Sequence, residues 1–100
     1  MELYLVDITK GYQGKYYREI YKYSYKSFTV MIMTFNHKIG SITIKDNYEN
    51  VRVSLTEDSY RIYPDCIIRD NFEKSVQKIL DARDLCEYLL LHKNDLIKSE

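Results

Sequence analysis

The chain has 100 residues, enough for one domain with a single hydrophobic core. Fifteen Lys and Arg residues balance fifteen Asp and Glu residues, which excludes both a globally basic nucleic-acid binder and a strongly acidic DNA mimic. The charges are unevenly distributed, because residues 1–45 carry seven basic and three acidic side chains whereas residues 46–100 carry eight and twelve.

No segment predicts export or membrane insertion. The longest wholly apolar runs, such as residues 30–33 and 89–91, are far too short to cross a bilayer, and no basic-then-apolar signal peptide is recognisable. Cys66 and Cys86 have no second cysteine or histidine at metal-ligand spacing, which favours reduced, partly buried thiols over a disulfide or a zinc site. We therefore expect a cytoplasmic protein.

The first predicted strand covers residues 2–9, in which apolar side chains occupy both alternating faces. The glycine-containing sequence of residues 10–14 then predicts a turn. Gly11 and Gly14 have the spacing of the GxxG loop in KH domains, but that loop joins two helices. We therefore expect an ordinary turn or hairpin loop here.

The most unusual segment is residues 10–26, which contains six tyrosines and five basic residues. The tyrosines at its start have helical spacing, but later ones have strand spacing. We favour a strand that begins near Tyr17, because tyrosine prefers sheets and no helix cap precedes it. In such a strand Tyr21, Tyr23 and Tyr25 share one face, and the other face carries Lys22, Ser24 and Lys26.

Residues 28–35 are apolar on both faces, which predicts a central strand. Such a strand is covered on both sides, or it is covered on one side and contacts a partner with the other. Residues 41–45, 51–55 and 60–62 alternate between apolar and polar and predict further short strands, joined by turns. Pro64 ends the last of them.

After Asp70 the apolar period changes to that of a helix. Asp70 or Asn71 can cap it, and the pattern continues to about His92. We expect this helix to bury Val76, Ile79 and Leu90 and to expose Lys74, Lys78 and Asp81.

Arg83 falls within the apolar stripe of the predicted helix. Three explanations are open: the helix breaks near Ala82, the arginine is a packed element paired with Glu87, or it anchors a partner.

No catalytic, cofactor or metal motif is recognisable. His37 and His92 have no partner at metal-ligand spacing, so we expect both to be solvated. Asp81, Asp84 and Glu87 form a row that is typical of a solvated helix surface. No serine or cysteine has the sequence context of an activated nucleophile. We expect no enzyme activity, no cofactor and no bound metal.

The tyrosines allow three roles: core packing, a protein-binding surface, or stacking of single-stranded nucleic acid. As protein-binding residues we predict Tyr12, Tyr16, Tyr17, Tyr21, Tyr23, Tyr25 and Arg83. The alternative, binding of RNA or single-stranded nucleic acid, would add the basic residues Lys15, Arg18, Lys22 and Lys26.

These observations predict a single α+β domain: an antiparallel sheet of about five short strands, covered on one face by a C-terminal helix. We expect a non-enzymatic module that binds a protein, either a host enzyme or a second copy of itself. In size, composition and lack of catalytic motifs the chain resembles small accessory proteins of bacteriophages and mobile elements. That resemblance implies an inhibitor or adaptor, and anti-defence activity of the anti-CRISPR type is one form it takes.

Overall fold

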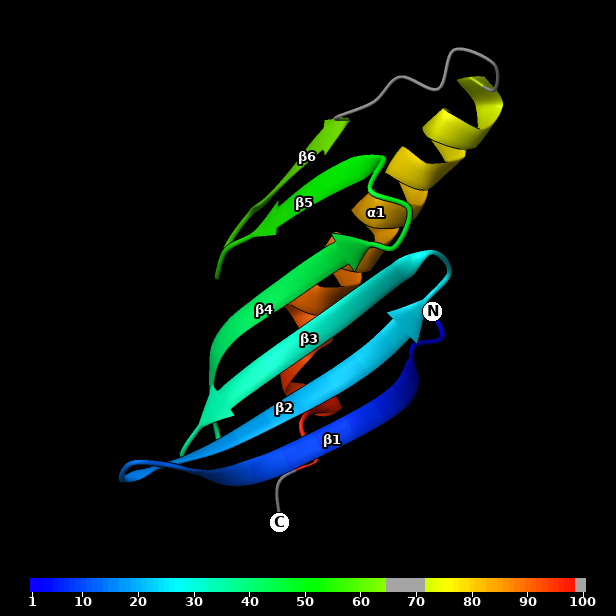
Figure 1. Ribbon diagram of the computed structural model, residues 1–100. Coiled ribbons are helices and arrows are strands. Elements are labelled where there is room, and N and C mark those ends of the chain that lie inside the picture. The colour runs from blue at the N-terminus through cyan, green and yellow to red at the C-terminus, as the bar shows by residue number, and fades with distance from the viewer. Residues whose placement is uncertain (65–71, 99–100) are drawn as a thin grey trace.

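The computed structural model describes residues 1–64 and 72–98, which form one antiparallel sheet with a long helix packed behind it (Figure 1). The α+β fold is therefore confirmed, with six strands instead of about five. The strands pair in sequential order and are β1 (Tyr4–Gln13), β2 (Tyr16–Tyr25), β3 (Phe28–Phe35), β4 (Lys38–Asp46), β5 (Val51–Leu55) and β6 (Tyr60–Pro64). The helix α1 (Phe72–His92) continues into a short 3-10 helix, η1 (Lys93–Leu96).

The segment with ambiguous period is a strand, as predicted. Strand β2 begins at Tyr16, and β1 extends through Gly11 to Gln13, so most of the predicted turn of residues 10–14 belongs to the strand. Only Gly14 and Lys15 lie between the two strands, and Gly14 has a φ of 62°, which favours glycine. The result is a long hairpin whose tip projects beyond the neighbouring strands (Figure 1).

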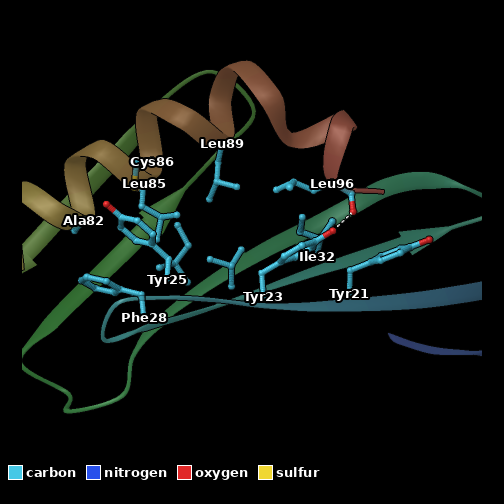
Figure 2. Close-up of a cluster of buried hydrophobic side chains, with 12 residues drawn as sticks. Tyr21, Tyr23, Tyr25, Phe28, Ile32, Ala82, Leu85, Cys86, Leu89 and Leu96 are labelled. Atoms are coloured by element: carbon cyan, nitrogen blue, oxygen red, sulfur yellow. Dashed lines mark hydrogen bonds between the residues drawn. The ribbon is translucent and has the colours of Figure 1, made fainter. Parts of the chain in front are cut away.

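The core lies between α1 and one face of the sheet (Figure 2). Burial of a large apolar side chain contributes roughly 1.5–3 kcal/mol, so this layer holds the helix on the sheet. The sheet supplies Tyr21, Tyr23, Tyr25, Phe28, Val30, Ile32 and Ile44, and the helix supplies Ala82, Leu85, Cys86 and Leu89.

The helix has nearly the predicted bounds, but it is rotated relative to the predicted buried face. Val76 is 38% exposed and Asp81 is buried, so both predictions were wrong. Ile79 and Leu90 are half-buried, on the edges of the covered stripe. The residues that face the sheet are Asp81, Ala82, Leu85, Cys86 and Leu89.

Two ion pairs explain the rotation. Lys78 is mostly buried, contrary to expectation, and its Nζ lies 3.3 Å from an Oδ2 of Asp46 at the end of β4. The Oδ1 of Asp81 accepts hydrogen bonds from Lys26, at 2.8 Å, and from Gln77, at 2.9 Å. Polar residues with ion-pair partners therefore lie on the side of the helix that faces the sheet. A prediction from the spacing of apolar residues alone consequently chose the wrong side of the helix as the buried one.

Some sequence predictions concern parts of the chain that the structure does not describe: the helix caps Asp70 and Asn71, the thiol of Cys66, and the side chain of Lys74. Cys86 is buried and free, as expected, and burial raises the pKa of its thiol to about 12. Among the described helices, none is both long enough and apolar enough to span a membrane.

Strands β4 and β5 diverge. Their register contains one pair, Lys45 with Arg52, whereas β3 and β4 pair along their whole length. The buried carboxylate of Asp46 fixes the turn between β4 and β5, because it accepts backbone N–H groups from Tyr48, Asn50 and Val51 at 3.0–3.1 Å. The distance between the two strands increases away from this turn (Figure 1).

Candidate interaction surface

The tyrosines of β2 divide into two groups. Tyr21, Tyr23 and Tyr25 lie under the helix in the core, so the structure corrects their assignment as contact residues (Figure 2). The hydroxyl of Tyr23 donates a hydrogen bond of 2.5 Å to the carbonyl of Leu96. All three rings are buried, and the hydroxyl of Tyr23 has a hydrogen-bond partner. These tyrosines therefore have the core role, in which tyrosine buries its ring and keeps its hydroxyl hydrogen-bonded.

Tyr12, Tyr16 and Tyr17 lie at the tip of the β1–β2 hairpin. Tyr12 is 78% exposed and stacks edge-on against Tyr17, with 5.2 Å between the ring centroids. Tyr16 is on the opposite face of the strand and meets Phe35 edge-on at 6.5 Å. These three tyrosines remain accessible, and their role in binding a protein stays a prediction.

A buried carboxylate supports this tip. Glu19 accepts a hydrogen bond of 2.7 Å from the hydroxyl of Tyr21, and its other oxygen lies 3.0 Å from Nδ1 of His37. Lys10 approaches to 3.5 Å. His37 is therefore held by a partner and is not simply solvated. The cluster fastens β1, β2 and the β3–β4 turn together beyond the end of the helix.

The same cluster sets the protonation of its members. Burial by itself raises the pKa of Glu19, but the Tyr21 hydroxyl and the Lys10 ammonium outweigh burial and hold this pKa below its ordinary value. Burial and the bond to Glu19 raise the pKa of Tyr21 to about 12. At neutral pH the pair is therefore an ionised carboxylate and a neutral phenol, a stable structural pair.

The predicted basic residues are scattered. Lys15 is exposed at the hairpin tip, and Lys26 lies at the other end of β2, in the turn where it pairs with Asp81. Arg18 and Lys22 lie on the sheet face opposite the helix, and Arg18 donates a hydrogen bond to Gln13 at 3.1 Å. No single surface unites these four residues, which weakens the nucleic-acid site as it was predicted.

Arg83 lies on the outer surface of α1, away from the sheet. Its guanidinium bonds the carboxylate of its neighbour Asp84, and its side chain is half exposed. The helix continues through this position to His92, so it does not break near Ala82, and the hydrogen-bonded partner of Arg83 is Asp84 instead of Glu87. A role of Arg83 in partner binding stays a prediction.

The helix covers one face of the sheet and leaves the other uncovered; we call the uncovered face the open face (Figure 1). Strand registers place an apolar stripe at its centre: Ile20 is paired with Met33, and Met31 lies opposite Lys22. Phe35 extends the stripe toward Tyr16, and its ring lies across Gly40, where a Cβ would come within 2.7 Å of it. The apolar stripe is thus formed by Ile20, Met31, Met33 and Phe35.

Basic residues surround the apolar stripe. Within the paired strands that the structure describes, the registers place six Lys and Arg residues on the open face but only one acidic residue, Asp7. Arg52 lies over the ring of Tyr63, 4.9 Å from its centroid. A neutral chain therefore presents one strongly positive surface. The six residues are Arg18, Lys22, Lys38, Lys45, Arg52 and Arg61.

The acidic residues that were predicted to form a solvated row on the helix each contact another side chain of this chain. Asp81 binds Lys26, Asp84 binds Arg83, and an oxygen of Glu87 accepts a hydrogen bond from the hydroxyl of Tyr60 at 3.1 Å. Across residues 1–64 and 72–98, no cluster of three or more His, Cys, Asp or Glu side chains has metal-binding geometry.

Sequence reasoning missed most of the open face. Lys38, Lys45, Arg52 and Arg61 come from three different strands, so their convergence follows from sheet order, which local pattern does not give. One signal was present: residues 28–35 are apolar on both faces, and the second face of this strand is the uncovered one. Comparison with known families, curated proteins and solved structures found no match to this chain.

Proposed function

We propose that this chain is a non-enzymatic interaction module that binds another protein through the open face of its sheet. The observation that carries the proposal is the apolar stripe on β2 and β3. Met31 is 38% exposed in the middle of the sheet, next to Lys22, on the face with no helix over it. A strand that is apolar on its solvent side is typical of a surface that a partner covers.

The chemistry of the open face indicates the partner's surface. Methionine and isoleucine adapt their shape to an opposing apolar patch, and methionine is enriched at protein interfaces. The surrounding basic residues favour a partner whose contact patch has an apolar centre and an acidic rim. Such charges mainly accelerate association and select the partner, while the buried centre supplies most of the affinity.

Single-stranded nucleic acid is the alternative that the basic charge favours. Binding of that kind relies on aromatic rings that stack bases along a positive groove. On the open face, however, three of the four residues of the apolar stripe are aliphatic or sulfur-containing. Phe35 is its one aromatic ring, and Tyr4, Tyr16 and Tyr63 lie toward the margins of the face. The arrangement therefore supports a protein partner better than a nucleic acid.

The biological role that we propose is that of a cytoplasmic inhibitor or adaptor that acts by occupying a surface of its target. Small size and the resemblance to accessory proteins of bacteriophages and mobile elements support this role. A host enzyme, including one of a defence system, is the kind of target that such a role requires.

Affinity capture from the native cell, followed by mass spectrometry, tests the proposal. The bait is the full chain, compared with a Met31→Glu variant that places a negative charge in the apolar stripe. The matched control is Leu91→Glu, at a residue 80% exposed on the helix. We expect a protein that the wild type and Leu91→Glu both retain and that Met31→Glu loses.

Two results contradict the proposal. Equal capture by Met31→Glu and by the wild type would place the contact elsewhere on the molecule. Tight binding of single-stranded RNA or DNA, with a log–log salt slope of about −4, would show that about six basic residues contact phosphates and would favour the alternative.

A further inference from the structure

A groove separates β4 from β5, on the side where the two strands diverge. Its volume is about 610 Å³. One wall is a continuous run of β4 and its preceding turn, residues 37–42, and the other wall is residues 55–57 at the end of β5. Lys93 and Asn94 of η1 complete the lining. The groove borders the open face, because Lys38 belongs to both, but Ile39 and Ile42 in its β4 wall point to the helix side of the sheet.

The groove is held open by contacts at both ends. At the narrow end, Asp46 binds Lys78 and the backbone of the β4–β5 turn. At the wide end, Lys93 donates a hydrogen bond of 3.2 Å to the backbone carbonyl of Glu57. The hydroxyl of Tyr60 similarly bonds Glu87 on the helix. The β5–β6 hairpin is thus attached to the helix, and it does not close against β4.

The β4 wall is an unpaired strand edge. Residues 38–44 are paired with β3 on one side, but the described chain has no strand partner for them on the other, since the β4–β5 register contains only Lys45 and Arg52. In an antiparallel sheet, alternate residues of such an edge direct their N–H and C=O groups outward. At about 3.4 Å per residue the seven residues of this edge extend about 24 Å.

We infer that this groove binds an extended peptide segment of a partner protein, which adds to β4 as an antiparallel or parallel strand. Unpaired main-chain donors and acceptors are best matched by another main chain, and side-chain pockets beside them provide selectivity. Ile39, Ile42 and Leu55 are half-buried and offer apolar contacts to alternate residues of the peptide.

The charges around the groove define the peptide further. Lys38 and Lys93 are positively charged, His37 is held by Glu19, and Glu57 is the only acidic residue among the lining side chains. The occupant that fits is a strand-forming peptide with alternating apolar residues and acidic residues at its ends. This inference does not depend on the protein partner proposed for the open face.

A titration followed by amide NMR of the full chain tests the inference. The probe is the acetylated and amidated peptide Glu-Val-Thr-Val-Thr-Val-Glu. Two control peptides have the same sequence but carry N-methyl groups on alternate backbone nitrogens. One control is methylated at the odd-numbered residues and the other at the even-numbered residues. The variant Lys38→Glu reverses a charge at the groove, and Lys15→Glu is the matched control at the distant hairpin tip. Because Lys38 also borders the open face, Met31→Glu is the control for binding to that face.

We expect saturable shifts of the amides of residues 38–44, with slowed hydrogen exchange there. At least one N-methylated peptide should fail to bind, because it lacks the backbone N–H groups that would donate hydrogen bonds to β4. Lys38→Glu should weaken binding about fivefold, the size of one exposed charge pair, and both Lys15→Glu and Met31→Glu should leave it unchanged. Three results would overturn the inference. The first is no saturation below about 1 mM, the second is binding of both methylated peptides as tightly as the unmodified one, and the third is shifts confined to the open face.

Discussion

Replacement of Tyr23 separates a core role of the β2 tyrosines from a binding role. The ring is 3% exposed beneath the helix, and its hydroxyl bonds the carbonyl of Leu96 (Figure 2). Tyr23→Ala removes the ring and leaves a cavity, so we expect a loss of about 3–5 kcal/mol in the free energy of unfolding. The residue is therefore not expected to tolerate alanine in the way a surface contact would.

Tyr23→Phe keeps the ring and removes only the hydroxyl. The carbonyl of Leu96 then loses its donor in a largely buried place, which costs about 1–3 kcal/mol. The control is Tyr12→Ala at the exposed hairpin tip, where surface substitution changes stability by less than about 0.5 kcal/mol.

Urea unfolding monitored by circular dichroism measures all three variants. The reasoning requires the order Tyr23→Ala, Tyr23→Phe, Tyr12→Ala, from the largest loss to the smallest. A Tyr23→Ala variant as stable as Tyr12→Ala would refute it, because it would show that the helix does not cover this part of the sheet.

Two further predictions concern buried carboxylates. Asp46→Ala leaves Lys78 and three backbone N–H groups without their acceptor, so we expect a loss of about 3–5 kcal/mol in urea unfolding, and a loss below about 1 kcal/mol would contradict the role of Asp46 in the β4–β5 turn. The pKa of Glu19 is lowered on folding, so its contribution to stability is present above its unfolded pKa of about 4.3 and is lost as the pH falls through the folded value. Glu19→Gln should therefore flatten the fall of stability with acid, and an unchanged pH profile would show that Glu19 is not ionised in a stabilising contact.

The sequence predicted the elements well and their faces less well. Alternation and turn residues located the strands, and the change of period located the helix, because these signals depend on local geometry. The helix face was misplaced because Lys78 and Asp81 find partners on Asp46 and Lys26, and such distant ion pairs leave no periodic signal. Propensity indicated that the tyrosines of β2 form a strand, but not which strand face the helix would cover.

The candidate site was predictable only in part. The accessible tyrosines at the hairpin tip and the doubly apolar strand β3 were visible in the sequence. The six basic residues around the apolar stripe could not be predicted as one surface, because they come from β2, β4, β5 and β6 and the order of the strands brings them together. The groove beside β4 was also hidden, because it follows from a register of one pair between two predicted strands.

Site-specific photo-crosslinking in the native cell tests the central claim most directly. p-Benzoylphenylalanine replaces Met31 on the open face or Leu91 on the outer surface of the helix, both of which are exposed. We predict a crosslink to a single protein species from position 31 and none from position 91. A crosslink from position 91 alone, or from position 31 to nucleic acid instead of protein, would contradict the account.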